Sequence, residues 1–279
     1  MSGPVVDSHT HLFAPDQARY PLADPRAAYR PETDGSVELL RREMDAAGVD
    51  RALTISPWPY RWDMRYALDA LAEHRSWLAV AVLVDPRSPD GPDRLERYVR
   101  DHGVSGLRIH GRTVDLGPYD DPATTPLWAK AAELGITVDA CAALDEYPQI
   151  AGRAAEFPDL PIVLDHCGYI SGELSPPEPT LGPVLAMARH PNVYAKLTFL
   201  PLASREQYPF ADVAWMARAV VDAFGAERCM YGSNFPTAQY NPRVDYRQAV
   251  RLFAEALELD EEERAWVLGG TAARLWRWR

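Results

Sequence analysis

Two histidines near the start of the sequence, separated by one residue, form the motif with the clearest chemical content. His9 and His11 lie in the run Val5 to Phe13, which begins and ends with apolar residues and has the character of a short strand. Because side chains alternate across a strand, the two imidazoles point the same way. Such a pair can bind a metal ion, hold a substrate or accept a proton. The spacing therefore predicts that His9 and His11 belong to a catalytic pocket.

Further polar side chains occur where other apolar runs end. Taking the apolar residues of each run as facing outward, alternation along a strand assigns the residues between them to the inner face. The residues assigned inward in this way are Arg108, His110, Asp139, Cys141, His166, Lys196, Thr198 and Asn234. Imidazoles and cations outnumber carboxylates in this set, so we expect the pocket to bind a small anionic substrate.

Several of these residues have a second interpretation that does not involve substrate. Arg108 and Lys196 could each form a structural ion pair with a carboxylate such as Asp139. His166 could simply cap the loop that follows its strand. The sequence leaves these alternatives open, and it favours a site because the residues occur together.

Eight β-rich runs, separated by helical patterns, must position these side chains. They are Val5 to His9, Arg51 to Ser56, Leu78 to Val84, Gly106 to His110, Ile136 to Cys141, Pro161 to His166, Asn192 to Thr198 and Arg228 to Ser233. Eight strand and helix units in one chain of this size favour a (β/α)8 TIM barrel, formed as a single domain over residues 1–279. A doubly wound open sheet is the main rival, but no glycine-rich phosphate turn follows the first run.

Start and stop signals mark several of the intervening helices. The helix predicted by the apolar stripe from Val37 to Ala47 should end at Gly48, because glycine tolerates the left-handed conformation that closes a helix. Thr125 and Pro126 predict a capped helix start, with its end at Gly135. Asn241 and Pro242 repeat this device and predict the start of the eighth helix.

Composition narrows the classes of partner and the cellular location. The net charge of −11 argues against general binding to nucleic acid or to anionic membranes. No signal peptide or membrane span is recognisable in the sequence, so we expect a cytoplasmic protein. The three cysteines, Cys141, Cys167 and Cys229, each lie within an apolar run and should be buried reduced thiols. The sequence is compatible with a homo-oligomer and does not fix its size.

Two long segments follow predicted strands, at the edge where barrel enzymes place their active-site loops. They run from Pro15 to Glu32 and from Gly168 to Pro183. The second could be a mobile lid or rigid proline-rich packing over the pocket. Tyr169, near its start, is a candidate for substrate binding.

The sequence resembles the amidohydrolase superfamily, in particular the amidohydrolase-related group that includes lactonases. Three segments carry the resemblance, namely Val6 to His11, Leu164 to Gly168 and Arg228 to Pro236. The resemblance implies a TIM-barrel enzyme in which His9, His11 and His166 bind a divalent metal, most simply Zn²⁺, or bind the substrate carbonyl and water without a metal.

Asn234 departs from the pattern of that family. The family usually has an aspartate there, which takes a proton from the attacking water, whereas an amide can only form hydrogen bonds. Either Asp139 or a neutral histidine would then have to act as the base, or the reaction is not a hydrolysis. The first hypothesis is a hydrolase that opens a lactone or related cyclic ester of a carboxylic acid. The alternatives are a metal-dependent decarboxylase or C–C lyase, a biosynthetic non-hydrolytic enzyme and a non-catalytic variant.

Overall fold

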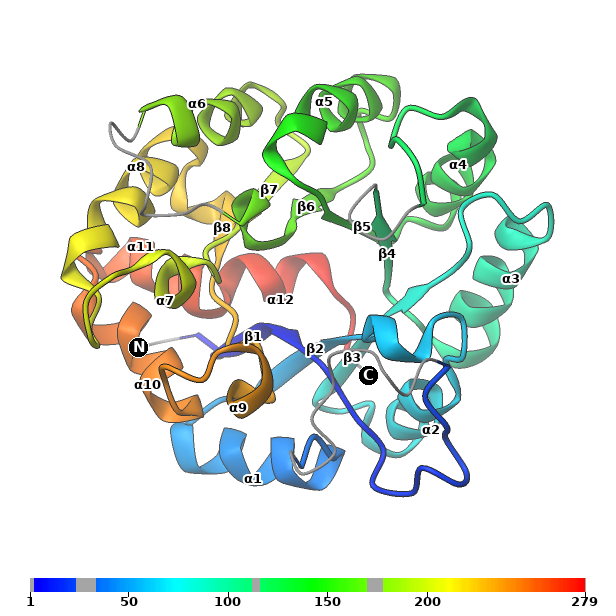
Figure 1. Cartoon of the computed structure of the whole chain (residues 1–279), viewed down its shortest axis with the longest axis horizontal. Helices are drawn as coiled ribbons and strands as arrows, with labels where there is room; N and C mark the ends of the chain where they lie inside the picture. The colour runs from blue at the N-terminus through cyan, green and yellow to red at the C-terminus, as the bar shows by residue number, and fades with distance from the viewer. Residues whose placement is uncertain (1–2, 24–33, 112–115, 170–177, 279) are drawn as a thin grey trace.

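The chain forms a ring of eight parallel strands surrounded by helices, which confirms the predicted (β/α)8 barrel (Figure 1). The computed structural model describes residues 3–23, 34–111, 116–169 and 178–278. Neighbouring strands pair in chain order from first to last. The strands are β1 (Val6–Thr10), β2 (Arg51–Ile55), β3 (Leu78–Leu83), β4 (Gly106–His110), β5 (Thr137–Cys141), β6 (Ile162–Leu164), β7 (Val193–Lys196) and β8 (Cys229–Met230).

Beyond the short last strand, single backbone contacts close the ring. The amide of Ser8 donates to the carbonyl of Tyr231 at 3.3 Å, and the amide of His11 donates to the carbonyl of Phe235 at 2.7 Å. A parallel bridge also joins Thr10 to Phe235. The first strand and the chain that follows β8 therefore lie side by side, which brings His9 and Asn234 together.

The helices are α1 (Val37–Ala47), α2 (Arg65–His74), α3 (Gly91–Arg97), α4 (Thr125–Leu134), α5 (Tyr147–Glu156), α6 (Glu178–Ala186), α7 (Leu200–Ala203), α8 (Ala214–Phe224), α9 (Thr237–Tyr240), α10 (Tyr246–Arg251), α11 (Glu261–Ala265) and α12 (Thr271–Leu275). Most of the helices lie around the outside of the ring, whereas the short α7 and α9 lie at its mouth and α12 closes its other end. In the view of Figure 1, α12 crosses the centre of the ring. Ala272 on this helix and Trp276 directly after it pack on inward residues of the strands, such as Val163 and Met230, so this part of the chain fills one end of the barrel.

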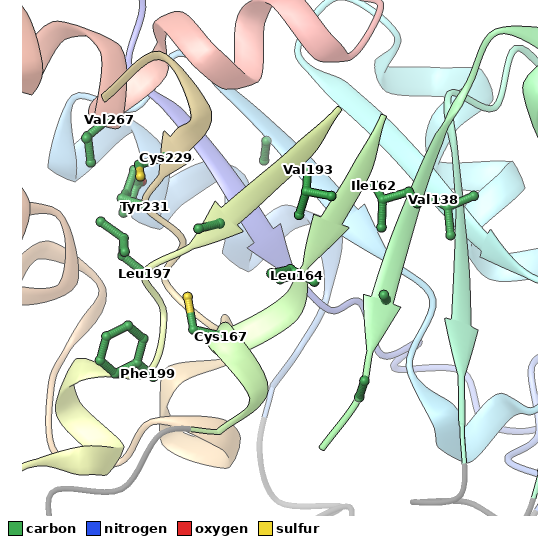
Figure 2. Packing of buried hydrophobic residues seen from close by; sticks show 14 of the residues in the cluster. Val138, Ile162, Leu164, Cys167, Val193, Leu197, Phe199, Cys229, Tyr231 and Val267 are labelled. Atoms are coloured by element: carbon green, nitrogen blue, oxygen red, sulfur yellow. The ribbon is translucent and has the colours of Figure 1, made fainter. Parts of the chain in front are cut away.

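Most of the apolar core lies between the strands and the outer helices. Outward residues such as Val138, Ile162 and Val193 belong to this layer, together with the buried thiols of Cys167 and Cys229 (Figure 2). Leu107 and Ile109 also face this layer, as the alternation on β4 predicts. The cysteines are buried and unpaired, in agreement with the prediction of reduced thiols.

Local details differ from the predicted boundaries in two helices. Thr125 does not cap α4, because its hydroxyl instead accepts a hydrogen bond from Arg153 at 2.9 Å. The helix predicted from Asn241 begins only at Tyr246, where Asp245 supplies the cap by accepting from the amide of Gln248. The predicted stops are correct, because Gly48 and Gly135 both adopt the left-handed conformation.

No helix among the described residues is long and apolar enough to cross a membrane. Of the two long loops, residues 24–33 and 170–177 lie outside the described ranges, and with them most of the segment proposed as a lid.

Candidate active site

The two histidines of the first motif lie side by side at the carboxyl end of β1, with His11 one residue beyond the strand. Their ring centroids are 4.9 Å apart, in an edge-to-face arrangement. The pairing of β1 with β2 shifts register between Asp7 and Thr10, which turns the end of the strand. Asp7 stays outside the barrel and accepts hydrogen bonds from the hydroxyl of Tyr246 at 2.8 Å and from the amide of Ser233 at 3.0 Å. This anchoring fixes the strand end that carries His9 and His11.

His166 joins this pair from a tight turn and not from a strand. The sequence predicted it at the end of the sixth strand, but β6 ends at Leu164 and His166 has a left-handed φ of 56°. The turn carries the imidazole over the barrel, where its centroid lies 4.5 Å from that of His9. Its Nδ1 is 2.6 Å from the hydroxyl oxygen of Thr198, which follows β7.

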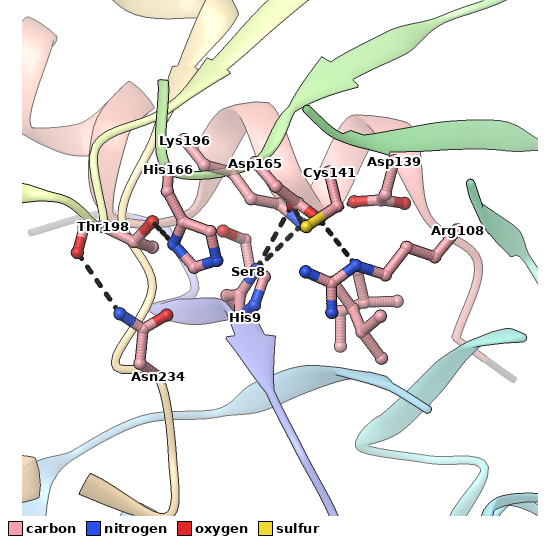
Figure 3. A network of polar contacts seen from close by, with 12 residues as sticks. Ser8, His9, Arg108, Asp139, Cys141, Asp165, His166, Lys196, Thr198 and Asn234 are labelled. Atoms are coloured by element: carbon pink, nitrogen blue, oxygen red, sulfur yellow. Dashed lines mark hydrogen bonds and ion pairs between the residues drawn. The ribbon is translucent and has the colours of Figure 1, made fainter. Parts of the chain in front are cut away.

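Asn234 approaches the histidines from the chain after β8. It also has a left-handed φ, 59°, and its amide N–H donates to the carbonyl of His9 at 3.0 Å. Its side-chain Nδ2 donates to the carbonyl of Thr198 at 3.3 Å, which fixes the orientation of the amide (Figure 3). The other amide atom, Oδ1, has no hydrogen-bond partner within the described parts of the chain. Asn234 therefore presents a buried acceptor.

Asp165 is the centre of a buried charge network that the sequence analysis did not assign. Its carboxylate lies 3.1 Å from Nε of Arg108, 3.0 Å from Nζ of Lys196 and 3.3 Å from Nδ1 of His9 (Figure 3). Burial alone would raise the pKa of Asp165, but Lys196 and Arg108 hold it well below its usual range. The sequence did contain a signal for Asp165. This residue lies two residues after Val163, which faces the barrel interior from β6, so alternation predicts that Asp165 faces inward as well.

Lys196 and Asp139 form a second ion pair at the centre of the barrel. Nζ of Lys196 lies 2.5 Å from Asp139, and both side chains are fully buried. Below them the Trp276 ring lies 5.5 Å from the ammonium. Burial raises the pKa of Asp139 to about 6, against the opposing effect of Lys196. The structure thus places these two residues in the ion pair that the sequence left open as an alternative to substrate binding.

Above this charged layer lies a cavity of about 280 Å³ at the carboxyl ends of the strands. Its wall includes six residues expected to bind substrate or catalyse, but also residues from short helices after β2, β7 and β8. The lining residues are His11, Pro57, Trp58, Pro59, Arg108, His110, His166, Tyr169, Leu202, Asn234 and Tyr240. His9, Asp139 and Lys196 are not among them and lie beneath. Trp58, Leu202 and Tyr240 were not predicted, since nothing in their local sequence distinguishes them from core residues.

The imidazoles of the cavity are neutral at physiological pH. Burial lowers the pKa of His11 to about 3 and that of His166 to about 3. Burial likewise lowers the pKa of His9 and of His110 well below the usual value. Each ring therefore carries one N–H donor and one lone pair.

The tautomer of His11 follows from its hydrogen bond. Nδ1 lies 2.8 Å from the carbonyl oxygen of Ile55, which can only accept, so Nδ1 carries the proton. Nε2 of His11 then holds the lone pair and can act as a base. His166 is different, because the hydroxyl of Thr198 can either donate to Nδ1 or accept from it.

A family model described as amidohydrolase matches residues 6–278, nearly the whole chain. The chain belongs to the amidohydrolase family. The predictions of family and of an amidohydrolase-related enzyme are confirmed.

Named relatives within the amidohydrolases include two lactone-opening enzymes. An L-fucono-1,5-lactonase of Burkholderia ambifaria is 27% identical, over 98% of this chain and 95% of the relative. A 4-sulfomuconolactone hydrolase of Hydrogenophaga intermedia is 25% identical, over 84% of this chain and 75% of the relative.

Several solved structures share the fold at low identity. A putative 2-pyrone-4,6-dicarboxylic acid hydrolase from Pseudomonas putida superposes with a TM-score of 0.83 at 23% identity, covering 99% of this chain and 98% of the other. An amidohydrolase from Burkholderia multivorans with bound zinc gives 0.77 at 22% identity, covering 99% and 100%. A 5-carboxyvanillate decarboxylase from Sphingomonas paucimobilis gives 0.71 at 18% identity, covering 100% of both chains.

An amidohydrolase of solved structure binds zinc, so the donor atoms of this site bear on whether a divalent ion would fit here. Within the described ranges no group of three or more His, Cys, Asp or Glu side chains is arranged to hold a metal. Asp165 is already neutralised by Arg108 and Lys196, and Asn234 offers an amide where a carboxylate ligand would add charge. The remaining donors are neutral imidazoles in edge-to-face and tilted arrangements. These residues do not fit a resident divalent metal.

Proposed function

We propose that this amidohydrolase opens the ring of a lactone, or a related cyclic ester, of a small carboxylic acid. One observation carries the proposal: the cavity brings together a neutral imidazole with a fixed lone pair, a guanidinium cation and an unpaired amide acceptor. These groups belong to His11, Arg108 and Asn234. They are the functions that adding water to an ester requires, namely a base, an anchor for an anion and a group that orients the water.

In this proposal His11 and Asn234 activate the water together. Oδ1 of Asn234 accepts a hydrogen bond from the water, and Nε2 of His11 accepts the proton that leaves as the oxygen attacks the carbonyl carbon. The C–O bond of the ring then breaks, and the ring oxygen takes the proton back from His11. The sum is one water added and one ester bond opened, which gives a hydroxy acid or its keto form.

Arg108 and His166 stabilise the negative charges of the bound molecule. The guanidinium of Arg108, oriented by Asp165, binds the carboxylate of the substrate. When the hydroxyl of Thr198 donates to Nδ1 of His166, the Nε2–H of that ring is left to stabilise the developing oxyanion. Because Lys196 is bound to Asp139 and Asp165, we give it no contact with substrate.

The arrangement supports catalysis without a resident metal, the second of the two options that the sequence left open. For the same reason the donor set gives no support to a metal-dependent decarboxylase, and the decarboxylase among the solved structures shares the fold alone. The predicted cytoplasmic location and oligomeric state stay predictions.

The test is hydrolysis of lactone carboxylates by purified protein and by variants of the two proposed catalytic histidines. We expect His11→Asn and His166→Asn each to lower kcat by about 10²- to 10⁴-fold, the usual contribution of a positioned acid or base. His190→Asn, which changes a histidine outside the cavity, serves as the matched control. Full turnover by the His11→Asn variant would contradict the proposal that His11 is the base.

A further inference from the structure

His110 differs from the other histidines of the cavity in the bonding of its ring. Nδ1 of His11 donates to the carbonyl of Ile55, and Nδ1 of His166 lies 2.6 Å from the hydroxyl oxygen of Thr198. In contrast, neither ring nitrogen of His110 has a hydrogen-bond partner within the described parts of the chain, although this residue is only 7% exposed. A buried polar group without a partner destabilises the folded protein, so these nitrogens indicate a partner that arrives with the ligand.

Packing sets the orientation of this ring in place of hydrogen bonds. His110 is the last residue of β4 and lines the cavity. The indole ring of Trp58 lies beside it, with the two ring centroids 5.1 Å apart and the ring planes at 53°. An aromatic neighbour at this distance restricts the imidazole without occupying its nitrogens. The ring is therefore held in place, and its polar edge is left for a bound molecule.

His110 lies across the cavity from Asn234. The strands follow one another in chain order around the ring, so β4 lies opposite β8, the strand that Asn234 follows (Figure 1). In the proposed function Asn234 orients the attacking water. A carbonyl carbon bound between the two residues has the water on one side and His110 on the other, so the bond that breaks can point toward His110.

Arg108 sets the distance between His110 and the carboxylate of the substrate. The two residues are two positions apart on the inner face of β4, which is about 6.5 Å along a strand. A carboxylate bound to Arg108 thus brings a neighbouring oxygen of the same molecule within reach of His110.

The charge state of His110 suits a hydrogen-bond donor. Burial lowers the pKa of His110, and the charges of Arg108 and His11 lower it further, so the ring is neutral. A neutral imidazole offers an N–H to an oxygen but keeps its proton. His110 can therefore stabilise negative charge on an oxygen, while another group must supply the proton.

We propose, resting on the lactone opening proposed above, that His110 donates a hydrogen bond to the ring oxygen of the substrate as the C–O bond breaks. The ring oxygen gains negative charge in this step and takes its proton from His11, while His110 keeps its own. The sum stays one water added and one ester bond opened. His166 then stabilises the carbonyl oxygen and His110 the ring oxygen, so the two charges that develop have separate donors.

The experiment compares two cyclic substrates that differ only in the ring atom, the lactone of 2-hydroxyglutarate and the thiolactone of 2-mercaptoglutarate. Each carries one carboxylate, on the carbon next to the ring oxygen or sulfur. Sulfur accepts hydrogen bonds weakly and leaves readily as a thiolate, so a donor at this position should matter for the lactone alone. We expect His110→Leu to lower kcat/KM about 100-fold for the lactone, the cost of one lost donor to an oxyanion, and less than about fivefold for the thiolactone.

Two further variants and a stability measurement separate this role from general damage. His110→Gln again offers an N–H and should regain about tenfold of the activity lost on the lactone. His102→Leu makes the same change at an exposed histidine and should leave both substrates unaffected. The urea midpoint of His110→Leu should be no lower than that of wild type, because the change removes polar atoms that have no partner. A lower midpoint would mean that the folded protein itself uses these nitrogens, which contradicts the inference.

The outcomes distinguish this inference from the lactonase proposal. An equal loss for both substrates in His110→Leu would overturn the inference and leave lactone opening in place. If wild type opens neither substrate, the lactonase proposal fails, and calorimetry then compares binding of the open acids 2-hydroxyglutarate and glutarate. Binding of 2-hydroxyglutarate that is about tenfold tighter, with this advantage lost in His110→Leu, would support His110 as the residue that holds the oxygen. Equal binding of the two acids, or binding of neither, would overturn the inference.

Discussion

At the scale of single residues, Asn234 decides how this site differs from the pattern that its motifs suggest. Two hydrogen bonds hold this residue. Its backbone N–H donates to the carbonyl of His9, and its side-chain Nδ2 donates to the carbonyl of Thr198. An aspartate could not donate to that second carbonyl, and its charge would be buried beside an oxygen. The side-chain amide of Asn234 therefore makes a hydrogen bond in this cavity that a carboxylate could not make.

We predict that Asn234→Asp lowers kcat/KM at pH 8 by at least about tenfold, the cost of one lost buried hydrogen bond. The variant should recover activity as the pH falls, because a protonated carboxyl can again donate to Thr198. A pH profile of kcat/KM measured beside wild type would show this reversed slope. Faster opening of many unrelated lactones at pH 8 would instead indicate that the natural site had lost its base.

Residue types predicted the floor of the site better than its walls. His9, His11, Arg108 and His110 come from alternation along β1 and β4, and all four lie at the predicted inner end of the barrel. Trp58 and Tyr240 could not be assigned, because they lie on short helices after strands, where no period relates a residue to the barrel axis.

At the scale of elements, close contact between two strands fixes the position of the first histidine. A Cβ added at Gly232, just after β8, would lie 2.6 Å from Cβ of His9 and 2.8 Å from a methyl carbon of Thr198. Glycine at this position therefore lets the chain pass in direct contact with His9 and Thr198. No larger residue fits without moving β1 or the segment after β7.

We predict that Gly232→Ala lowers the free energy of unfolding by about 1–3 kcal/mol, the usual cost of overpacking, and lowers kcat as well. Gly152→Ala, on the exposed face of α5, is the matched control, because no atom lies within 4 Å of the added Cβ. That control should be neutral or slightly stabilising, since alanine favours a helix over glycine. Urea unfolding and turnover of both variants check the prediction, and equal stability of the two would contradict it.

The order of the elements followed from the sequence, whereas several of their ends did not. Eight apolar runs sufficed for eight strands, because a buried parallel strand needs little more than that pattern. The left-handed turn at His166 was hidden, since the preceding run continues as if the strand did. Asp245 caps α10 where Asn241 was expected, because capping depends on the geometry with which the chain enters the helix.

At the scale of the whole molecule, the buried neutral histidines make stability depend on pH. A histidine whose pKa is lowered in the folded state binds fewer protons there than in the unfolded chain, so stability falls as the pH drops below about 6.5. His11 and His166, each with a folded pKa of about 3, would each cost about 2 kcal/mol at pH 5. Asp139, with its pKa raised to about 6, acts in the opposite sense and offsets about 1 kcal/mol.

These three groups together should lower the free energy of unfolding by about 3 kcal/mol between pH 7.5 and pH 5. His9 and His110, whose pKa values burial also lowers, add to this fall, whereas Asp7, whose pKa burial raises, opposes it. Urea titrations at the two pH values measure it directly. His166→Gln removes one of the titrating groups and should reduce the difference by about 2 kcal/mol, whereas the surface variant His190→Asn should leave most of it. A stability that does not change over this interval would mean that the buried rings are already protonated.

The position of α12 also has a consequence for how the protein is made. Trp276 completes the apolar interior that begins with Val6, so the first strand packs against residues that leave the ribosome about 270 positions later. Until then the inner face of the emerging strands has no cover, and local contacts alone cannot close it. Folding of this barrel should therefore be completed only once α12 and Trp276 have left the ribosome, and the nascent chain should expose the inner face of its strands until then.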